Sequence, residues 1–66
     1  MIMINDIMVC SFVVTGRYYN STKRFKKTFE GTNSGYNQAN MINLWNGSVW
    51  AVNTTGGRKR IKQVIN

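Results

Sequence analysis

The sequence predicts a small α+β domain, an antiparallel sheet of about four strands with one short helix packed on one face. Segments rich in β-branched and aromatic residues are separated by turn residues, which is typical of strands joined in hairpins. One central stretch instead repeats apolar residues every three positions, as a helix does. The 66 residues are enough for one domain only, spanning 1–66, in the order strand, strand, helix, strand, strand.

The first two strands are expected to form a hairpin. Residues 7–19 are apolar on both alternating faces at first, which is typical of a strand covered on both sides. Asn20-Ser21-Thr22 supplies turn chemistry, and residues 23–32 then alternate. Phe25 and Phe29 share one face of that second strand with Lys27, while Arg24, Lys26, Thr28 and Glu30 share the other.

The helix is expected over residues 35–46, with Ser34 as its N-cap. Tyr36, Ala39, Ile42 and Trp45 recur at helical spacing, and Asn46-Gly47 is expected to end the helix. Its asparagines are weak helix formers, so packing against the sheet must stabilise it.

A second hairpin is expected from residues 48–52 and 58–65, joined by a glycine-containing loop over residues 53–57. Strict alternation in its last strand places Lys59, Ile61, Gln63 and Ile65 on one side and Arg58, Arg60, Lys62 and Val64 on the other.

The core is expected to combine the helix stripe with one face of the sheet. The sheet residues assigned to it are Phe12, Val14, Phe25, Phe29, Trp50, Val52, Ile61 and Ile65. Cys10, in an apolar strand, is expected to be a buried structural thiol.

Positive charge is the most informative chemical feature of the chain. Nine lysines and arginines face two acids, so the formal net charge is +7. This charge opposes compaction, and its presence indicates a negatively charged partner. Eight of the nine cations fall in two clusters, each expected on or beside the second strand of a hairpin. The candidate partner-binding residues are Arg17, Tyr19, Lys23, Arg24, Lys26, Lys27, Arg58, Lys59, Arg60 and Lys62.

The arrangement of the two clusters has two alternatives. The clusters form one stripe if their strands are neighbours in the sheet, and two separate patches if the strands lie at opposite edges. The second cluster is equally explained as the guarding of an edge strand by charge.

Catalytic and metal-binding parts are scarce. The chain has no histidine, one cysteine, and carboxylates only at Asp6 and Glu30. Paired acid–base catalysis and a Cys/His zinc site are therefore not expected, and neither is a cofactor. We expect a binding protein and not an enzyme.

Residues 23–45, a basic hairpin followed by a helix, resemble the AP2-type and integrase arm-binding domains, which set a β-sheet in the DNA major groove. The order of elements in the whole chain is similar to that of some small anti-CRISPR proteins of phages.

Size, charge and a composition typical of AT-rich phages favour a phage or mobile-element protein. We expect it to engage a host nucleoprotein machine, a defence or transcription complex, or another acidic protein surface. Direct DNA or RNA binding is the alternative, and a virion or assembly component is the second. Cytoplasmic action in a bacterial host is expected, with no membrane partner and with self-association left open.

Overall fold

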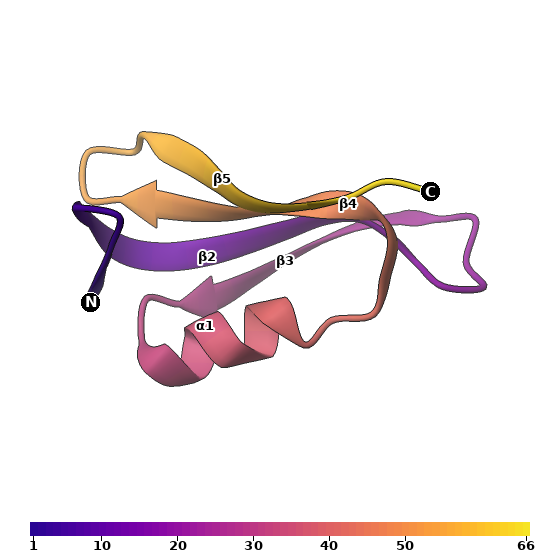
Figure 1. The fold of residues 1–66 in the computed structure, drawn as a ribbon, viewed down its shortest axis with the longest axis horizontal. Coiled ribbons are helices and arrows are strands. Elements are labelled where there is room, and N and C mark those ends of the chain that lie inside the picture. The colour runs from indigo at the N-terminus through magenta and orange to yellow at the C-terminus, as the bar shows by residue number, and fades with distance from the viewer.

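The computed structural model describes all 66 residues and confirms the predicted α+β architecture (Figure 1). One short helix lies between the third and fourth of five strands, below a curled antiparallel sheet. The molecule is elongated, with extents of 34 × 20 × 16 Å. Its elements are β1 (Ile2–Ile4), β2 (Ile7–Tyr18), β3 (Arg24–Glu30), α1 (Asn33–Asn40), β4 (Leu44–Asn53) and β5 (Arg58–Val64).

The long strand β2 organises the sheet. Along one side it pairs with β4, which in turn pairs with β5. Along its other side it pairs first with β1 and then with β3, so these two strands share one side of β2 end to end. Consequently β3 and β5 are outer strands on opposite sides of the sheet.

The extra strand β1 exists because a tight turn folds the start of the chain back onto β2. Asn5 and Asp6 both have positive φ, at 50° and 65°, as a two-residue turn with the right twist for a hairpin requires. This turn places Ile4 opposite Ile7 and Ile2 opposite Val9. The sequence prediction of about four strands lacked this short fifth one.

The sheet has two different faces. We call the side that packs against α1 the helix face and the opposite side the open face. The helix face carries the core, in which Phe12 lies between its cross-strand neighbours Phe29 and Ala51 and contacts the ring of Tyr36 at a centroid distance of 5.4 Å. The buried cluster comprises Val9, Phe12, Val14, Ala39, Leu44, Val49 and Ala51.

The helix is shorter than the sequence predicts. It begins at Asn33, where Thr32 is the N-cap and its Oγ1 accepts a hydrogen bond of 3.0 Å from the Gly35 N–H, and it ends at Asn40. The expected N-cap at Ser34 and the expected continuation to Asn46 are therefore wrong. Leu44 and Trp45 belong instead to β4, which pairs with β2, and Ile42 lies in the connection between α1 and β4.

Gly47 is a strand residue and not a helix stop. It lies directly opposite Gly16 of β2, and Gly16 has a φ of +139°. A Cβ on Gly16 would overlap the carbonyl oxygen of Asn46, and a Cβ on Gly47 would overlap that of Thr15. Two backbones thus approach closely at this point, where only glycine fits on either strand.

Four residues expected in the core lie elsewhere. Trp45 is 39% exposed and Ile65 is 74% exposed, while Trp50 and Val52 lie on the open face next to core residues of β4. Cys10 is also exposed, with its Sγ donating to the Asn53 carbonyl oxygen at 3.3 Å. The expected core residues Phe12, Val14 and Ala39 are confirmed as buried, and Phe25, Phe29, Tyr36, Ile42 and Ile61 pack against them.

Candidate nucleic-acid interface

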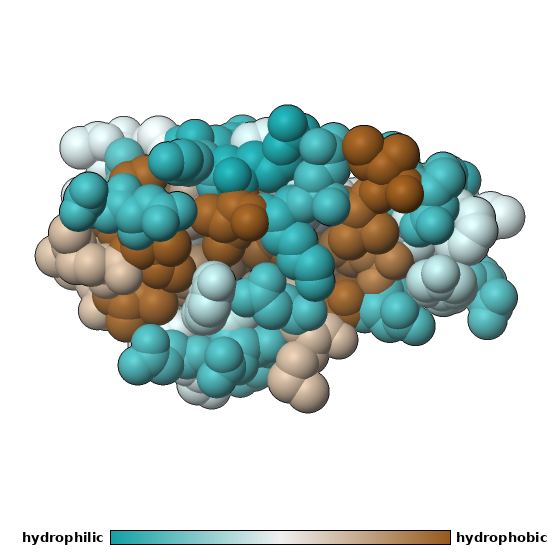
Figure 2. Space-filling model, viewed as in Figure 1, coloured by the Kyte–Doolittle hydropathy of each residue, from teal (hydrophilic) through white to brown (hydrophobic).

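The open face gathers positive charge from three strands. Side chains alternate along each strand, and the pairing register aligns those on the open face in cross-strand rows. Space-filling Figure 2 views the sheet edge-on, with hydrophilic residues along most of the upper and lower rims and hydrophobic residues showing between them and at the upper right. The cations on the open face, which we call the open-face cations, are Arg17, Arg24, Lys26, Arg58 and Arg60.

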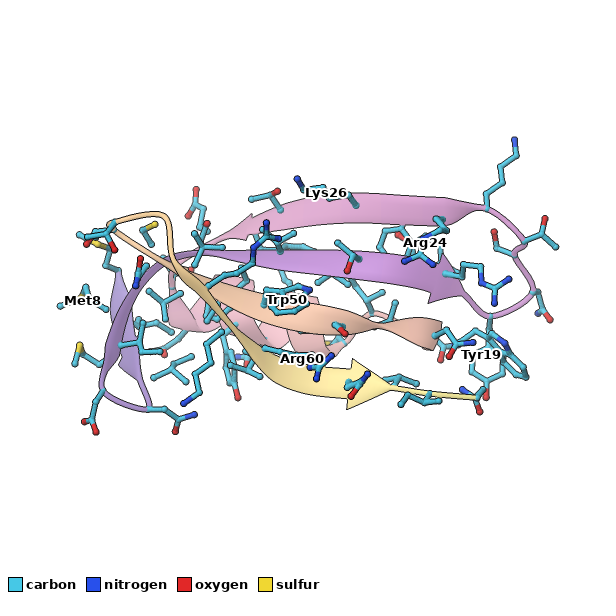
Figure 3. All side chains as sticks on the ribbon, turned by 90° about the horizontal axis from the view of Figure 1, so that it is seen from above. Met8, Tyr19, Arg24, Lys26, Trp50 and Arg60 are labelled. Carbon is cyan, nitrogen blue, oxygen red and sulfur yellow. The ribbon has the colours of Figure 1, made fainter.

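The two sequence clusters lie on opposite outer strands, yet they meet on one face. Figure 3 looks onto the open face with α1 behind the sheet, and there Arg24 and Lys26 on β3 lie on one side of Trp50 and Arg60 on the other. The structure therefore shows the second alternative, with the two basic strands at opposite edges of the sheet. Each cluster nevertheless sends alternate cations to the same surface.

The remaining cations lie away from this surface. Lys23 lies in the loop between β2 and β3 and is exposed. Lys27 shares the helix face with Phe29, and its Nζ lies 5.5 Å from the centre of that ring. Lys59 lies on the helix face opposite Ala51. The structure therefore divides the sequence-predicted site residues into two sets.

Lys62 has a structural contact. Its Nζ donates a hydrogen bond of 3.2 Å to the carbonyl oxygen of Asn40, the last residue of α1. A β-bulge in β5 beside Val49 breaks the expected alternation, so Arg60 pairs with Trp50 on the open face while Lys62 pairs with Val49 on the helix face. The expectation that Lys62 shares a side with Arg60 is wrong for this reason.

Like charges are held side by side at one end of the open face. Arg17 of β2 and Arg24 of β3 are direct cross-strand partners, an arrangement that destabilises a sheet when nothing lies between the charges. Glu30 is on the same face of β3 but six residues from Arg24, roughly 20 Å along the strand. Asp6 lies in the turn between β1 and β2. Neither carboxylate is placed to compensate the arginine pair.

Trp50 occupies the middle of the open face between two arginines. The guanidinium carbons of Arg58 and Arg60 lie 5.7 and 5.6 Å from the centre of its ring, within the range of cation–π attraction. Its cross-strand neighbour Val13 is only 8% exposed although it points away from the helix, because side chains on this face cover it. The centre of the surface is thus an apolar patch bordered by arginines.

Two tyrosines follow one another at the end of β2 and point to opposite faces. Tyr18 stacks on Phe25 with ring centres 4.0 Å apart and an interplanar angle of 7°. Tyr19 meets Trp45 edge-on, at 5.0 Å and 87°, and both rings are partly exposed. Sequence reasoning found Tyr19 but assigned Trp45 and Trp50 to the core. The sequence held a signal for the position of Trp50, because it lies between Val49 and Ala51 in a strand and must point to the opposite face from them.

Comparison of the chain with protein-family models, with curated proteins and with solved structures finds no match. The structure contains no helix with the length and hydrophobicity needed to cross a membrane. It also contains no group of three or more histidine, cysteine, aspartate and glutamate side chains arranged to hold a metal ion.

Proposed function

We propose that this chain is a small non-enzymatic protein that binds nucleic acid through its open face. The observation that carries the proposal is that five cations from β2, β3 and β5 share one face of the sheet, which the helix leaves uncovered. The directly opposed pair Arg17 and Arg24 favours it most, since an anion between two such guanidinium groups turns their repulsion into attraction.

The chemistry of the surface suits a phosphate backbone. Arginine, which supplies four of the five open-face cations, binds phosphate oxygens in a bidentate manner. Phosphate contacts hold a nucleic acid in place without reading its sequence, so cations spread over one face of a sheet are sufficient for general binding. We place this activity in the cytoplasm of a bacterial host, an assignment supported by the single unpaired cysteine.

The test compares two triple variants that remove equal charge from different sides. One replaces the open-face residues Arg24, Lys26 and Arg60 by serine, and the other replaces Lys23, Lys27 and Lys59. Fluorescence polarisation with labelled oligonucleotides measures affinity at several salt concentrations. If the five open-face cations contact phosphates, the log–log salt slope is about −3.5 on a single strand and about −4.5 on duplex DNA.

The open-face variant keeps two of the five cations, so its salt slope should fall to about −1.4 on a single strand and about −1.8 on duplex DNA. It should also lose at least ten times more affinity than the matched control, although both variants carry the same net charge. Equal losses would show that binding follows total charge and not this surface. A flat salt response of the unmodified protein would contradict nucleic-acid binding altogether.

A second candidate function is engagement of an acidic protein surface on a host nucleoprotein machine, in the manner of an anti-CRISPR-like inhibitor. Cross-strand partners Met3 and Met8, 57% and 45% exposed, favour it. Flexible methionine side chains suit contact with another protein and contribute little to phosphate binding. Capture from bacterial lysate with and without nuclease separates the two functions. A partner retained after nuclease treatment, and lost when Met3 and Met8 become serine, supports this candidate.

A further inference from the structure

One end of the open face carries a hollow with exposed aromatic walls. It has a volume of about 530 Å³ and lies where the β2–β3 loop passes beside the start of β4. Tyr19 and Trp45 are 46% and 39% exposed there, a large fraction for rings of this size in so small a protein. The lining residues are Arg17, Tyr19, Asn20, Ser21, Thr22 and Trp45.

The two rings form a right-angled corner. Their centres are 5.0 Å apart with an interplanar angle of 87°, so the edge of one ring meets the face of the other. We call Tyr19 and Trp45 the aromatic corner. This edge-to-face geometry is favourable for two aromatic rings, and it leaves part of their surface turned toward the hollow.

Three hydrogen bonds hold the backbone of the corner in place. The Tyr19 N–H donates to the Asn43 carbonyl oxygen at 3.3 Å, which ties the end of β2 to the start of β4. On the other side, the carbonyl oxygen of Trp45 accepts from the Asn66 side-chain amide, and Asn46 Oδ1 accepts from the Asn66 N–H at 3.0 Å. The rings are therefore presented by fixed backbone, which reduces the entropy that binding would cost.

Arg17 connects the hollow to the charged surface. It is one of the open-face cations and also lines the hollow, next to Arg24 on the neighbouring strand. A ligand that fills the hollow and continues along the open face therefore needs a flat apolar part beside a negative charge. A nucleotide unit has both parts, and it repeats them along a chain.

We infer that the aromatic corner binds an unpaired base of a single-stranded nucleic acid whose phosphates run along the open-face cations. The inference rests on the proposed function and adds the ligand class. A stacked base must expose its ring face, which only an unpaired base does. The width of the sheet also favours a single strand, because four paired strands span about 14 Å, whereas a major groove about 12 Å wide admits only two.

The decisive probe is an oligonucleotide that keeps its phosphates and loses its bases. The protein is titrated with a labelled 12-nucleotide thymidine strand, the uridine equivalent, an abasic strand of equal length and a duplex, all at one salt concentration. We expect the thymidine or uridine strand to bind at least fivefold more tightly than the abasic strand and the duplex. This comparison needs no variant and separates stacking from charge.

The variants then locate the stacking. Tyr19→Leu and Trp45→Leu keep apolar bulk but remove the ring, and each should weaken binding of the base-bearing strand by about 5- to 150-fold. Neither should change affinity for the abasic strand. Trp45→Phe keeps an aromatic ring and should retain most of the affinity that Trp45→Leu loses. If the role of Trp45 were purely structural, the loss and the recovery would appear on the abasic strand as well. Circular dichroism checks that each variant is folded.

The outcomes distinguish the two claims. Equal affinity for base-bearing and abasic strands, tighter binding of duplex, or equal losses on both strands in the leucine variants would overturn the inference while leaving charge-driven binding intact. Absence of binding to every probe at low salt would remove both the inference and the proposed function.

Discussion

The Nζ of Lys62 lies 3.2 Å from the carbonyl oxygen of Asn40, so a charge on β5 contacts the C-terminal end of α1. The last carbonyls of a helix have no partner within it, and a cation there satisfies one of them and complements the helix dipole. This contact joins α1 to β5, which is the outer strand on that side of the sheet. Lys62 therefore stabilises the fold, although it lies in the same basic cluster as Arg58 and Arg60, which bind nucleic acid in our proposal.

We therefore expect Lys62→Met to destabilise the protein by about 1–2 kcal/mol, because it leaves a helix-end carbonyl without its charged donor. Lys59→Met removes the same charge from the same strand and is the matched control, with an expected change within about 0.5 kcal/mol. Urea unfolding followed by circular dichroism measures both. Equal effects would mean that the Lys62 contact contributes nothing beyond net charge.

Gly16→Ala should destabilise the protein severely. The added methyl group meets backbone of β4, which cannot move away without breaking the pairing, and the φ of +139° is strained for alanine. A loss of at least about 3 kcal/mol is expected, against a total stability of about 3–10 kcal/mol for a chain of this length. Gly56→Ala isolates the strain, because Gly56 has a φ of +89° with open space around it, and should cost only about 1–2 kcal/mol.

Ile42→Asp should unfold the protein, and Ile65→Asp should not. Ile42 packs against the core cluster, where an unpaired carboxylate costs several kcal/mol, whereas Ile65 is 74% exposed. Both substitutions change the net charge equally. Thermal melting compares them, and an unchanged melting temperature of Ile42→Asp would contradict the position of this residue in the core.

Asp6→Gly should stabilise the hairpin of β1 and β2 by about 0.4–1 kcal/mol. Asp6 has a φ of 65°, and an Asn-Gly pair is the preferred occupant of this kind of turn. Asp6→Asn makes the same change in charge while keeping a side chain, so it is the control. A gain in chemical-denaturation midpoint that is equal for both variants would assign the effect to charge.

The alternation of side chains along β3 made part of the open face predictable from the sequence. Because Arg24 and Lys26 are two residues apart in a regular strand, they share a face, and Phe25 and Phe29 take the other. The hairpin turns and the order of the elements follow from similarly local signals. These features depend on neighbouring residues only, which a sequence displays directly.

The errors come from long-range pairing. The β-bulges beside Trp45 and Ile61 change which residues face the helix, and nothing in their neighbourhood signals them. The helix ends early because Leu44 and the residues after it pair with β2, an interaction between segments more than 20 residues apart. The early turn at Asn5 and Asp6 had a local signal, since asparagine and aspartate tolerate positive φ, but the strand it produces is only three residues long.

The division of each cluster between two faces has a consequence for any complex. If the open-face cations are neutralised by five phosphates, the net charge of +7 falls to about +2, and Lys27 and Lys59 remain on the other side. The bound protein would therefore still attract polyanion from behind. If the proposed binding holds, such a molecule would bridge two strands or two turns of one strand, and high occupancy would compact the nucleic acid instead of only coating it.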